Sequence, residues 1–185
     1  LAGSESTLAV LTAARLRLVP WFQHTTTALV AVDSITAGTR LLATLRKSLT
    51  SLDAVEVIAP AAMTLVSNHL GRQPPVSSPE AVLYVMIDCA DHGDPSEQLL
   101  DVLSQADGII DSAVTTDAVQ RERLVAFRDR ITDAIAAAST EVGVPTFKLD
   151  VAVPLDALAQ LIEVAQDAAD ADGCQLIPFG HLAEG

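Results

Sequence analysis

The stretch TTTALVAVDSITAGTRLLATLRKSL, residues Thr25–Leu49, indicates how this chain folds. Its first part, Thr25–Ser34, is rich in β-branched residues and predicts a strand. Leucines at helical spacing follow and predict a helix over Ile35–Leu49, with Ser34 at the position expected of an N-cap. A short strand is predicted next, at Ala54–Pro60. The stretch therefore opens a strand–helix–strand unit.

The rest of the chain continues this alternation. Strands are predicted at Leu8–Val19, Ala81–Ala90, Gly108–Thr116, Phe147–Pro154 and Cys174–Leu182, and helices at Ala61–Leu70, Pro95–Ala106, Asp117–Ser139 and Leu155–Asp172. Short strands that pair across single helices favour an α+β fold, with a ferredoxin-like antiparallel sheet and helices packed mainly on one face. The alternative is a doubly wound parallel sheet, which usually carries a GxGxxG turn that this chain lacks.

Composition limits the classes of function. The 185 residues are half apolar, enough for one domain with a sizeable core, and the formal net charge is −13. Such acidity argues against binding to nucleic acid or to an anionic membrane surface. No apolar run reaches the ~20 residues of a spanning helix, and the first residues do not have the pattern of a signal peptide. Two distant cysteines, Cys89 and Cys174, fit a reducing, cytoplasmic compartment rather than a disulfide scaffold or a zinc ribbon.

The ends of the sequence predict a piece of a longer protein. The chain opens on Leu1, close to an apolar run, and closes at HLAEG directly after another, whereas natural domains usually have polar ends. The sequence also contains no P-loop, HExxH, GxSxG or EF-hand pattern, so no complete site of those types is expected.

One candidate for anion binding lies on the predicted helix Asp117–Ser139. Arg128 falls at the edge of its apolar stripe, and Thr132 follows one turn later on the same side. A guanidinium at the edge of a core requires an anion. In one interpretation, Arg128 forms an internal salt bridge. In the other, its guanidinium binds a substrate carboxylate, and the Thr132 hydroxyl lies beside that carboxylate.

Two further candidates lie on predicted strands. Lys148 shares one strand face with Asp150 and Ala152, which is either a solvated face or a polar site covered by another domain. His181 ends the last strand, where an imidazole is either structural or a metal ligand or proton-transfer group. The remaining acidic and histidine side chains are interpreted as solvated surface, including those of His24, His69, His92, Asp88, Asp91, Asp94 and the run Asp167–Asp172.

Several segments together resemble a family. GSESTLAVLT (3–12) is similar to the GSEGTLGxxT segment that closes the FAD-binding domain of FAD-linked oxidases of the vanillyl-alcohol-oxidase type. Segments similar to their C-terminal substrate domain follow in the family's order: DAVEVIAPAAMTLVSNHLG, LYVMIDC, FRDRITDAI, FKLDVAVPL and IPFGHLAEG. The resemblance covers nearly the whole chain and lies nearest to the subgroup of D-2-hydroxyglutarate dehydrogenase, D-lactate dehydrogenase and glycolate oxidase flavoprotein subunit.

The resemblance implies an activity and its residues. Such enzymes transfer a hydride from C2 of a D-2-hydroxy acid to FAD, which passes electrons to an acceptor protein or quinone. In the family, the LRxxIT and YKYD segments bind substrate carboxylates. The matching positions here are Arg128, Thr132 and Lys148, so the resemblance implies that these residues bind the substrate. The first histidine of the family's HLGDGNLH matches His181, which is thereby implied as a catalytic residue and a ligand of a divalent metal such as zinc.

The resemblance also divides the chain. Residues 1–20 are expected to end an FAD-binding domain, with Gly3, Ser4 and Thr7 near the cofactor, and residues 21–185 to form the substrate (cap) domain. Two family glycines are replaced here, by Ser6 and Ala9, and the family's NLH would lie beyond Gly185. We therefore expect this chain alone neither to hold FAD nor to turn over.

Alternatives remain at this stage. The chain could be a non-catalytic ferredoxin-like module for ligand binding or dimerisation, which needs none of these motifs. A related flavoenzyme that acts on lactones, alditols or phenols would not need Arg128, Thr132 and Lys148. Arg128 and Lys148 together could bind two carboxylates, which favours a dicarboxylate substrate. A homodimer is the expected assembly.

Overall fold

A computed structural model describes residues 7–18 and 20–182 of the chain. Its strands are β1 (His24–Val32), β2 (Leu52–Ile58), β3 (Leu83–Asp91), β4 (Ile109–Thr115) and β5 (Phe179–His181). Its helices are α1 (Ile35–Ser48), α2 (Pro60–Leu70), α3 (Ser96–Gln105), α4 (Ala118–Asp129), α5 (Ile131–Val142), the 3-10 turn η1 (Leu155–Ala157) and α6 (Leu158–Ala171). Within the described ranges, no helix is both long and apolar enough to cross a membrane.

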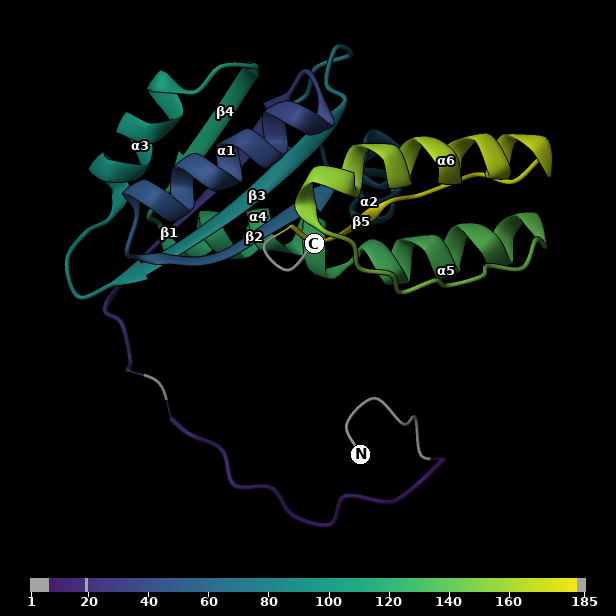
Figure 1. The fold of residues 1–185 in the computed structure, drawn as a ribbon, viewed down its shortest axis with the longest axis horizontal. Coiled ribbons are helices and arrows are strands. Elements are labelled where there is room, and N and C mark those ends of the chain that lie inside the picture. The colour runs from purple at the N-terminus through teal and green to yellow at the C-terminus, as the bar shows by residue number, and fades with distance from the viewer. Residues whose placement is uncertain (1–6, 19, 183–185) are drawn as a thin grey trace.

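The five strands form one sheet in the order β4-β1-β3-β2-β5, and all neighbouring strands are antiparallel (Figure 1). Helix α1 joins β1 to β2 and α3 joins β3 to β4, so two split strand–helix–strand units interleave. This arrangement confirms the predicted α+β class and ferredoxin-like antiparallel sheet. The parallel alternative is excluded.

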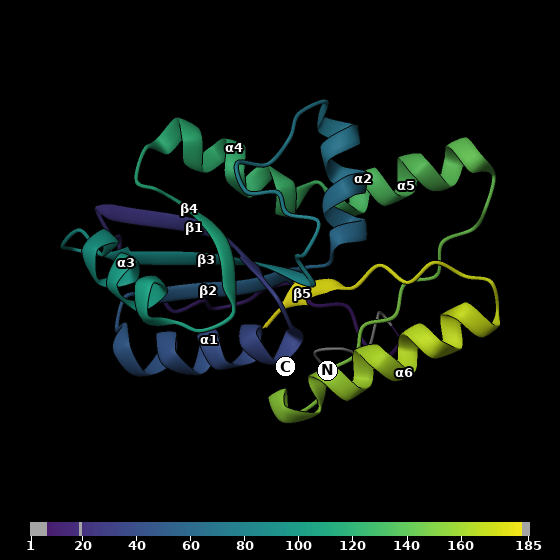
Figure 2. The ribbon, with the colours of Figure 1, turned by 90° about the horizontal axis from the view of Figure 1, so that it is seen from above.

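Helices cover both faces of this sheet, as Figure 2 shows from above. Helices α1 and α3 pack on one face, against the strand residues Val30, Val85 and Ile87. Helices α2, α4 and α5 pack on the other, against Leu29 and Met86. The expectation that helices lie mainly on one face is therefore corrected. Strand β3 is buried on both faces through most of its length, which needs a layer of helices on each side.

The ends of two helices agree with the sequence. The Ser34 hydroxyl accepts a hydrogen bond from the backbone N–H of Ala37 and caps α1. Gly71 closes α2 with φ of 64°, a left-handed conformation that favours glycine. The helix predicted over Asp117–Ser139 is interrupted at Arg130, which separates α4 from α5.

Two predicted strands are absent from the described residues. Residues 8–18 of the predicted strand Leu8–Val19 form no strand and extend away from the sheet (Figure 1). The segment Phe147–Pro154 also forms no strand, and its Phe147 and Leu149 side chains are exposed. The last strand is shorter than predicted, because only Phe179–His181 pair with β2. Alternating apolar residues provide strand propensity, but a strand also needs a neighbour to receive its hydrogen bonds.

Candidate functional site

The sheet face beneath α4 carries a group of polar side chains. On this face of β1, Thr27 is the next residue to buried Leu29. On the same face of β3, Asp88 is the next residue to buried Met86. Thr27 lies directly opposite Asp88 in the strand register. The same face therefore changes from apolar at Leu29 and Met86 to polar at Thr27 and Asp88.

Asp88 is the most buried carboxylate of this group, with a side chain only 7% exposed. Its Oδ1 accepts a hydrogen bond from the Thr27 hydroxyl at 2.5 Å and another from Nη2 of Arg121 at 3.3 Å. Its Oδ2 accepts from Nη1 of Arg128 at 3.1 Å. Arg121 and Arg128 stand seven residues apart on α4, about two helical turns, so one carboxylate of the central sheet fixes that helix at two points.

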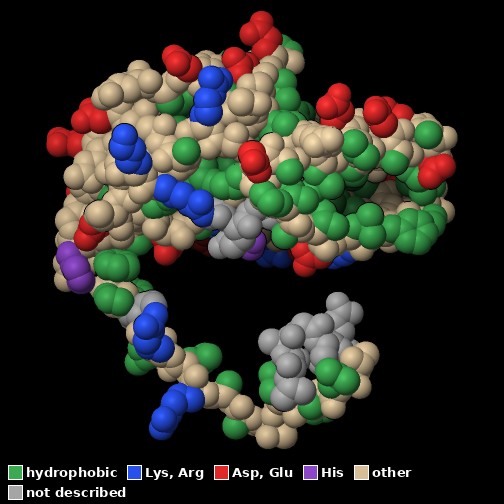
Figure 3. Space-filling model, viewed as in Figure 1, with side chains coloured by type: hydrophobic (Ala, Val, Ile, Leu, Met, Phe, Trp, Pro, Cys, Tyr) green, Lys and Arg blue, Asp and Glu red, His purple; other side chains and the backbone are tan. Residues whose placement is uncertain are grey.

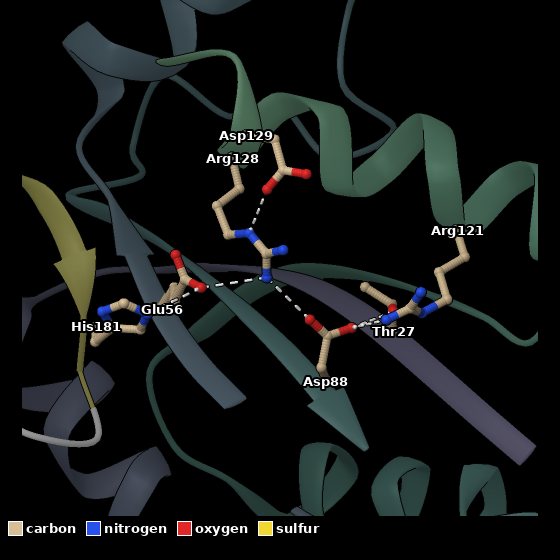
Figure 4. A network of polar contacts seen from close by, with 7 residues as sticks. All are labelled: Thr27, Glu56, Asp88, Arg121, Arg128, Asp129 and His181. Carbon is tan, nitrogen blue, oxygen red and sulfur yellow. Dashed lines mark hydrogen bonds and ion pairs between the residues drawn. The ribbon is translucent and has the colours of Figure 1, made fainter. Parts of the chain in front are cut away.

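Arg128 contacts three carboxylates, as Figure 4 shows. Its Nη1 pairs with Asp88 and lies 3.2 Å from Oε1 of Glu56, while its Nε donates to Oδ1 of Asp129 at 2.9 Å. Burial opposes the charged form of the guanidinium, but the hydrogen bond to Asp129 and the three carboxylate charges outweigh it and raise the pKa of Arg128. Arg128 is therefore a fixed cation at any pH of interest.

Glu56 links Arg128 to the last strand. It lies opposite His181 in the pairing of β2 with β5, and its Oε1 is 3.6 Å from Nε2 of His181. Burial raises the pKa of Glu56, and the charges of Arg128 and His181 offset this only in part. The network thus runs across the sheet from His181 through Glu56 and Arg128 to Asp88 (Figure 4).

The structure unites only some of the residues that the sequence singled out. Arg128 and His181 share Glu56 as a neighbour. Thr132 lies beyond the helix break, is exposed, and forms no hydrogen bond with Arg128 in the described part of the chain. Lys148 is exposed on a segment that is not a strand. Of the two interpretations of Arg128, the internal ion pair is present, and its role toward a substrate remains a prediction.

The predicted cofactor contacts are only partly described. Gly3 and Ser4 lie outside the described residues, and Thr7 is exposed. For a metal, the structure offers the His181 imidazole and the Glu56 carboxylate, but no group of three or more potential ligands occurs among residues 7–18 and 20–182. Two groups fall short of the three or four protein ligands of a zinc site. The described residues therefore supply too few ligands to fit a zinc site.

Sequence reasoning missed three members of the network. The sequence pattern indicates a solvated Asp88, whereas its side chain is 7% exposed, and the pattern assigns no role to Glu56 or Arg121. For Glu56 a signal existed, because a carboxylate inside the apolar run AVEVIAP requires a partner. The pairing of Asp88 with Thr27 depends on a register between strands 61 residues apart, and no local pattern specifies it.

The network can bind a further group at one place. Nη2 of Arg128 makes no hydrogen bond or ion pair with any described residue, and in Figure 4 no dashed line reaches this third nitrogen of the guanidinium. The Arg128 side chain is 23% exposed, so this nitrogen belongs to a partly accessible guanidinium. Carboxylates hold the guanidinium at Nη1 and Nε, and Nη2 remains as a donor. A planar guanidinium in this state is suited to bind a carboxylate ligand.

Comparisons with known proteins agree with the resemblance. A family model described as FAD linked oxidases, C-terminal domain, matches residues 22–185. The chain is 28% identical over 189 residues to the mitochondrial D-2-hydroxyglutarate dehydrogenase of Rattus norvegicus, an alignment covering 99% of this chain and 34% of that protein. It is 24% identical over 185 residues to the D-lactate dehydrogenase of Archaeoglobus fulgidus, covering 100% of this chain and 39% of that protein. The chain thus spans little more than a third of the length of these relatives.

Proposed function

Because this chain belongs to the family of FAD linked oxidase C-terminal domains, we propose that it forms the substrate-binding part of an FAD-dependent 2-hydroxy acid dehydrogenase. The substrate would be of the D-2-hydroxyglutarate, D-lactate or glycolate type and the product a 2-oxo acid, and the names of the two relatives support the first two types. When bound, the flavin supplies the hydride acceptor. Residues 21–185 would serve as the cap domain, and residues 1–20 would end the FAD-binding domain.

The state of Arg128 is the observation that carries this proposal. Its Nη1 is held by Asp88 and Glu56 from two strands, so the plane of the guanidinium is set before a ligand arrives. Its Nη2 is left to donate to the carboxylate that every 2-hydroxy acid carries. His181 enters the same network through Glu56, which supports the catalytic role that the resemblance implies for it. The roles of Thr132 and Lys148 stay predictions.

Substitution of Arg128 in the intact flavoenzyme tests the proposal. Arg128→Met should raise KM and lower kcat for D-lactate, glycolate or D-2-hydroxyglutarate, measured by reduction of a dye. Loss of a hydrogen bond to a charged group predicts a fall of about ten- to a hundredfold in kcat/KM. Arg130→Met is the matched control, because Arg130 is 58% exposed and pairs with Asp133 instead. Unchanged kinetics in Arg128→Met would favour either a flavoenzyme for lactones, alditols or phenols or a purely structural Arg128.

A second experiment addresses the chain by itself. We expect the purified polypeptide to show no flavin absorbance and no dye reduction by 2-hydroxy acids. Absorbance and turnover would be compared with those of the intact enzyme at equal concentration. A bound flavin that a 2-hydroxy acid reduces would contradict the division at residue 20.

A further inference from the structure

The three carboxylates around Arg128 differ in how firmly they are held. Asp88 and Glu56 project from strands of the sheet, with side chains 7% and 14% exposed, and both contact Nη1. Asp129 contacts Nε and is 55% exposed. It is the last residue of α4, where the negative end of the helix dipole disfavours a carboxylate. Two partners of Arg128 are therefore fixed, and the third is free to move into solvent.

The position of Asp129 matters because of how guanidinium binds carboxylate. A carboxylate can bind side-on, with two parallel hydrogen bonds from Nε and Nη2. Asp129 takes only the Nε bond of this edge, and Nη2 has no partner among the described residues. The remaining nitrogen, Nη1, already contacts Asp88 and Glu56. A ligand that binds Arg128 through two bonds must therefore displace Asp129 from Nε.

We propose that Asp129 is a displaceable internal carboxylate on the substrate-binding edge of Arg128, and that it lowers the affinity of that edge for substrate. This inference rests on the proposed function, in which Arg128 binds the carboxylate of a 2-hydroxy acid. A ligand carboxylate regains the Nε bond and adds the Nη2 bond, so it exchanges with Asp129 at little cost. Asp129 thus lowers the affinity of every ligand that needs Nε, and its negative charge repels an anionic ligand more than a neutral one.

This exchange predicts that two Asp→Asn substitutions around one arginine act in opposite directions. Asp129→Asn removes a competitor and should lower KM for a 2-hydroxy acid. An exposed ion pair contributes up to about 1 kcal/mol, which corresponds to a fall in KM of about two- to fivefold. Asp88→Asn removes a fixed partner that orients the guanidinium and should raise KM. A purely structural role for Asp129 would not lower KM.

The experiment uses the intact flavoenzyme with D-lactate and its neutral amide, lactamide, as probes. Asp129→Asn should lower KM for D-lactate with kcat little changed, and should widen the preference for D-lactate over lactamide in kcat/KM, because the lost charge repels only the anion. The matched control is Asp133→Asn, because Asp133 is 53% exposed, lies four residues away and pairs with Arg130 rather than Arg128. It removes the same charge from the same surface and should leave both probes unchanged within a factor of about 1.5.

Each result decides the inference. A KM for D-lactate that is unchanged or raised in Asp129→Asn, or an equal fall in Asp133→Asn, overturns it. If Arg128→Met raises KM while Asp129→Asn has no effect, the proposed function stands and this inference alone fails. If Arg128→Met also leaves KM unchanged, or D-lactate, glycolate and D-2-hydroxyglutarate all fail to reduce the wild-type flavin, both fail.

Discussion

Two regions of this molecule have similar sequence patterns and different structures. The sheet unit, defined as β1–β4 with α1–α4, buries nearly all the apolar side chains of its central strands β1 and β3. The C-terminal arm, defined as residues 143–178, has an equally regular apolar alternation in FKLDVAVP, yet Phe147 and Leu149 are more than four-fifths exposed. Figure 3 shows apolar side chains gathered on the surface at the end of the molecule formed by α5 and α6. Pairing with a neighbouring strand, rather than the pattern itself, makes the difference.

The sheet unit and the C-terminal arm contribute differently to the candidate site. Its fixed part, Asp88 and Glu56 with Arg128, lies on the sheet and on a helix that the sheet holds at two points. Lys148 lies on the arm, where no described strand pairing fixes it. The geometry around Arg128 is therefore set by the sheet unit, and any contribution of Lys148 to the proposed site depends on what orders the arm.

The largest expected contrast is in cysteine reactivity. Cys89 is 1% exposed in β3, and burial raises the pKa of its thiol to about 11, which leaves little thiolate at pH 8. Cys174, on the arm, is exposed. Iodoacetamide should alkylate Cys174 more than about a thousandfold faster than Cys89, since Cys89 reacts only after the sheet opens. Peptide mass spectrometry over time measures both rates, and comparable rates would show that the sheet unit is loosely packed.

The second contrast uses one substitution in both regions. Phe127 is 2% exposed against the sheet, and Phe147 is 84% exposed. Phe127→Ala should lower the free energy of unfolding by about 3–5 kcal/mol because it leaves a cavity. Phe147→Ala should change it by less than about 0.5 kcal/mol. Urea titration followed by circular dichroism measures both, and a large loss in Phe147→Ala would show that the arm packs in solution.

The third contrast concerns acidic residues. Asp88→Asn leaves Arg121 and Arg128 without their shared counter-charge, and both guanidiniums are partly exposed. We expect a loss of about 2–3 kcal/mol in the free energy of unfolding, less than for fully buried pairs. Asp150→Asn removes an exposed carboxylate of the arm and should change stability by less than about 0.5 kcal/mol. Equal effects of the two substitutions, in the same urea titration, would mean that Asp88 does not hold α4.

These contrasts explain which parts of the structure the sequence could predict. Local signals sufficed for Ser34 as N-cap and Gly71 as C-cap, since each acts within one helical turn. The need of Arg128 for an anion was also predictable, because it follows from position on an amphipathic helix. The identity of that anion was not, because it depends on the register of β3 against β1. No proline or glycine marks the helix break at Arg130. The separation of Thr132 from Arg128 could therefore not be predicted from the sequence.

The smallest contrast concerns two glycines that share a left-handed backbone. Gly108 has φ of 82° and Gly173 has φ of 65°, so alanine at either costs about 1 kcal/mol in backbone conformation. At Gly108 a Cβ would also lie 2.6 Å from Cβ of Ala37 and 2.9 Å from Oδ1 of Asp33, whereas at Gly173 nothing lies within 4 Å. Relief of that overlap requires α1 to shift from the sheet, because Ala37 is buried on its inner side.

We therefore expect Gly108→Ala to destabilise the protein by about 1–2 kcal/mol more than Gly173→Ala, measured by the same urea titration. Both substitutions carry the same backbone penalty, so their difference reports only on how closely α1 packs against the turn before β4. Equal losses would mean that α1 moves away from this turn at no cost, and that the close packing of the sheet unit does not extend to its edge.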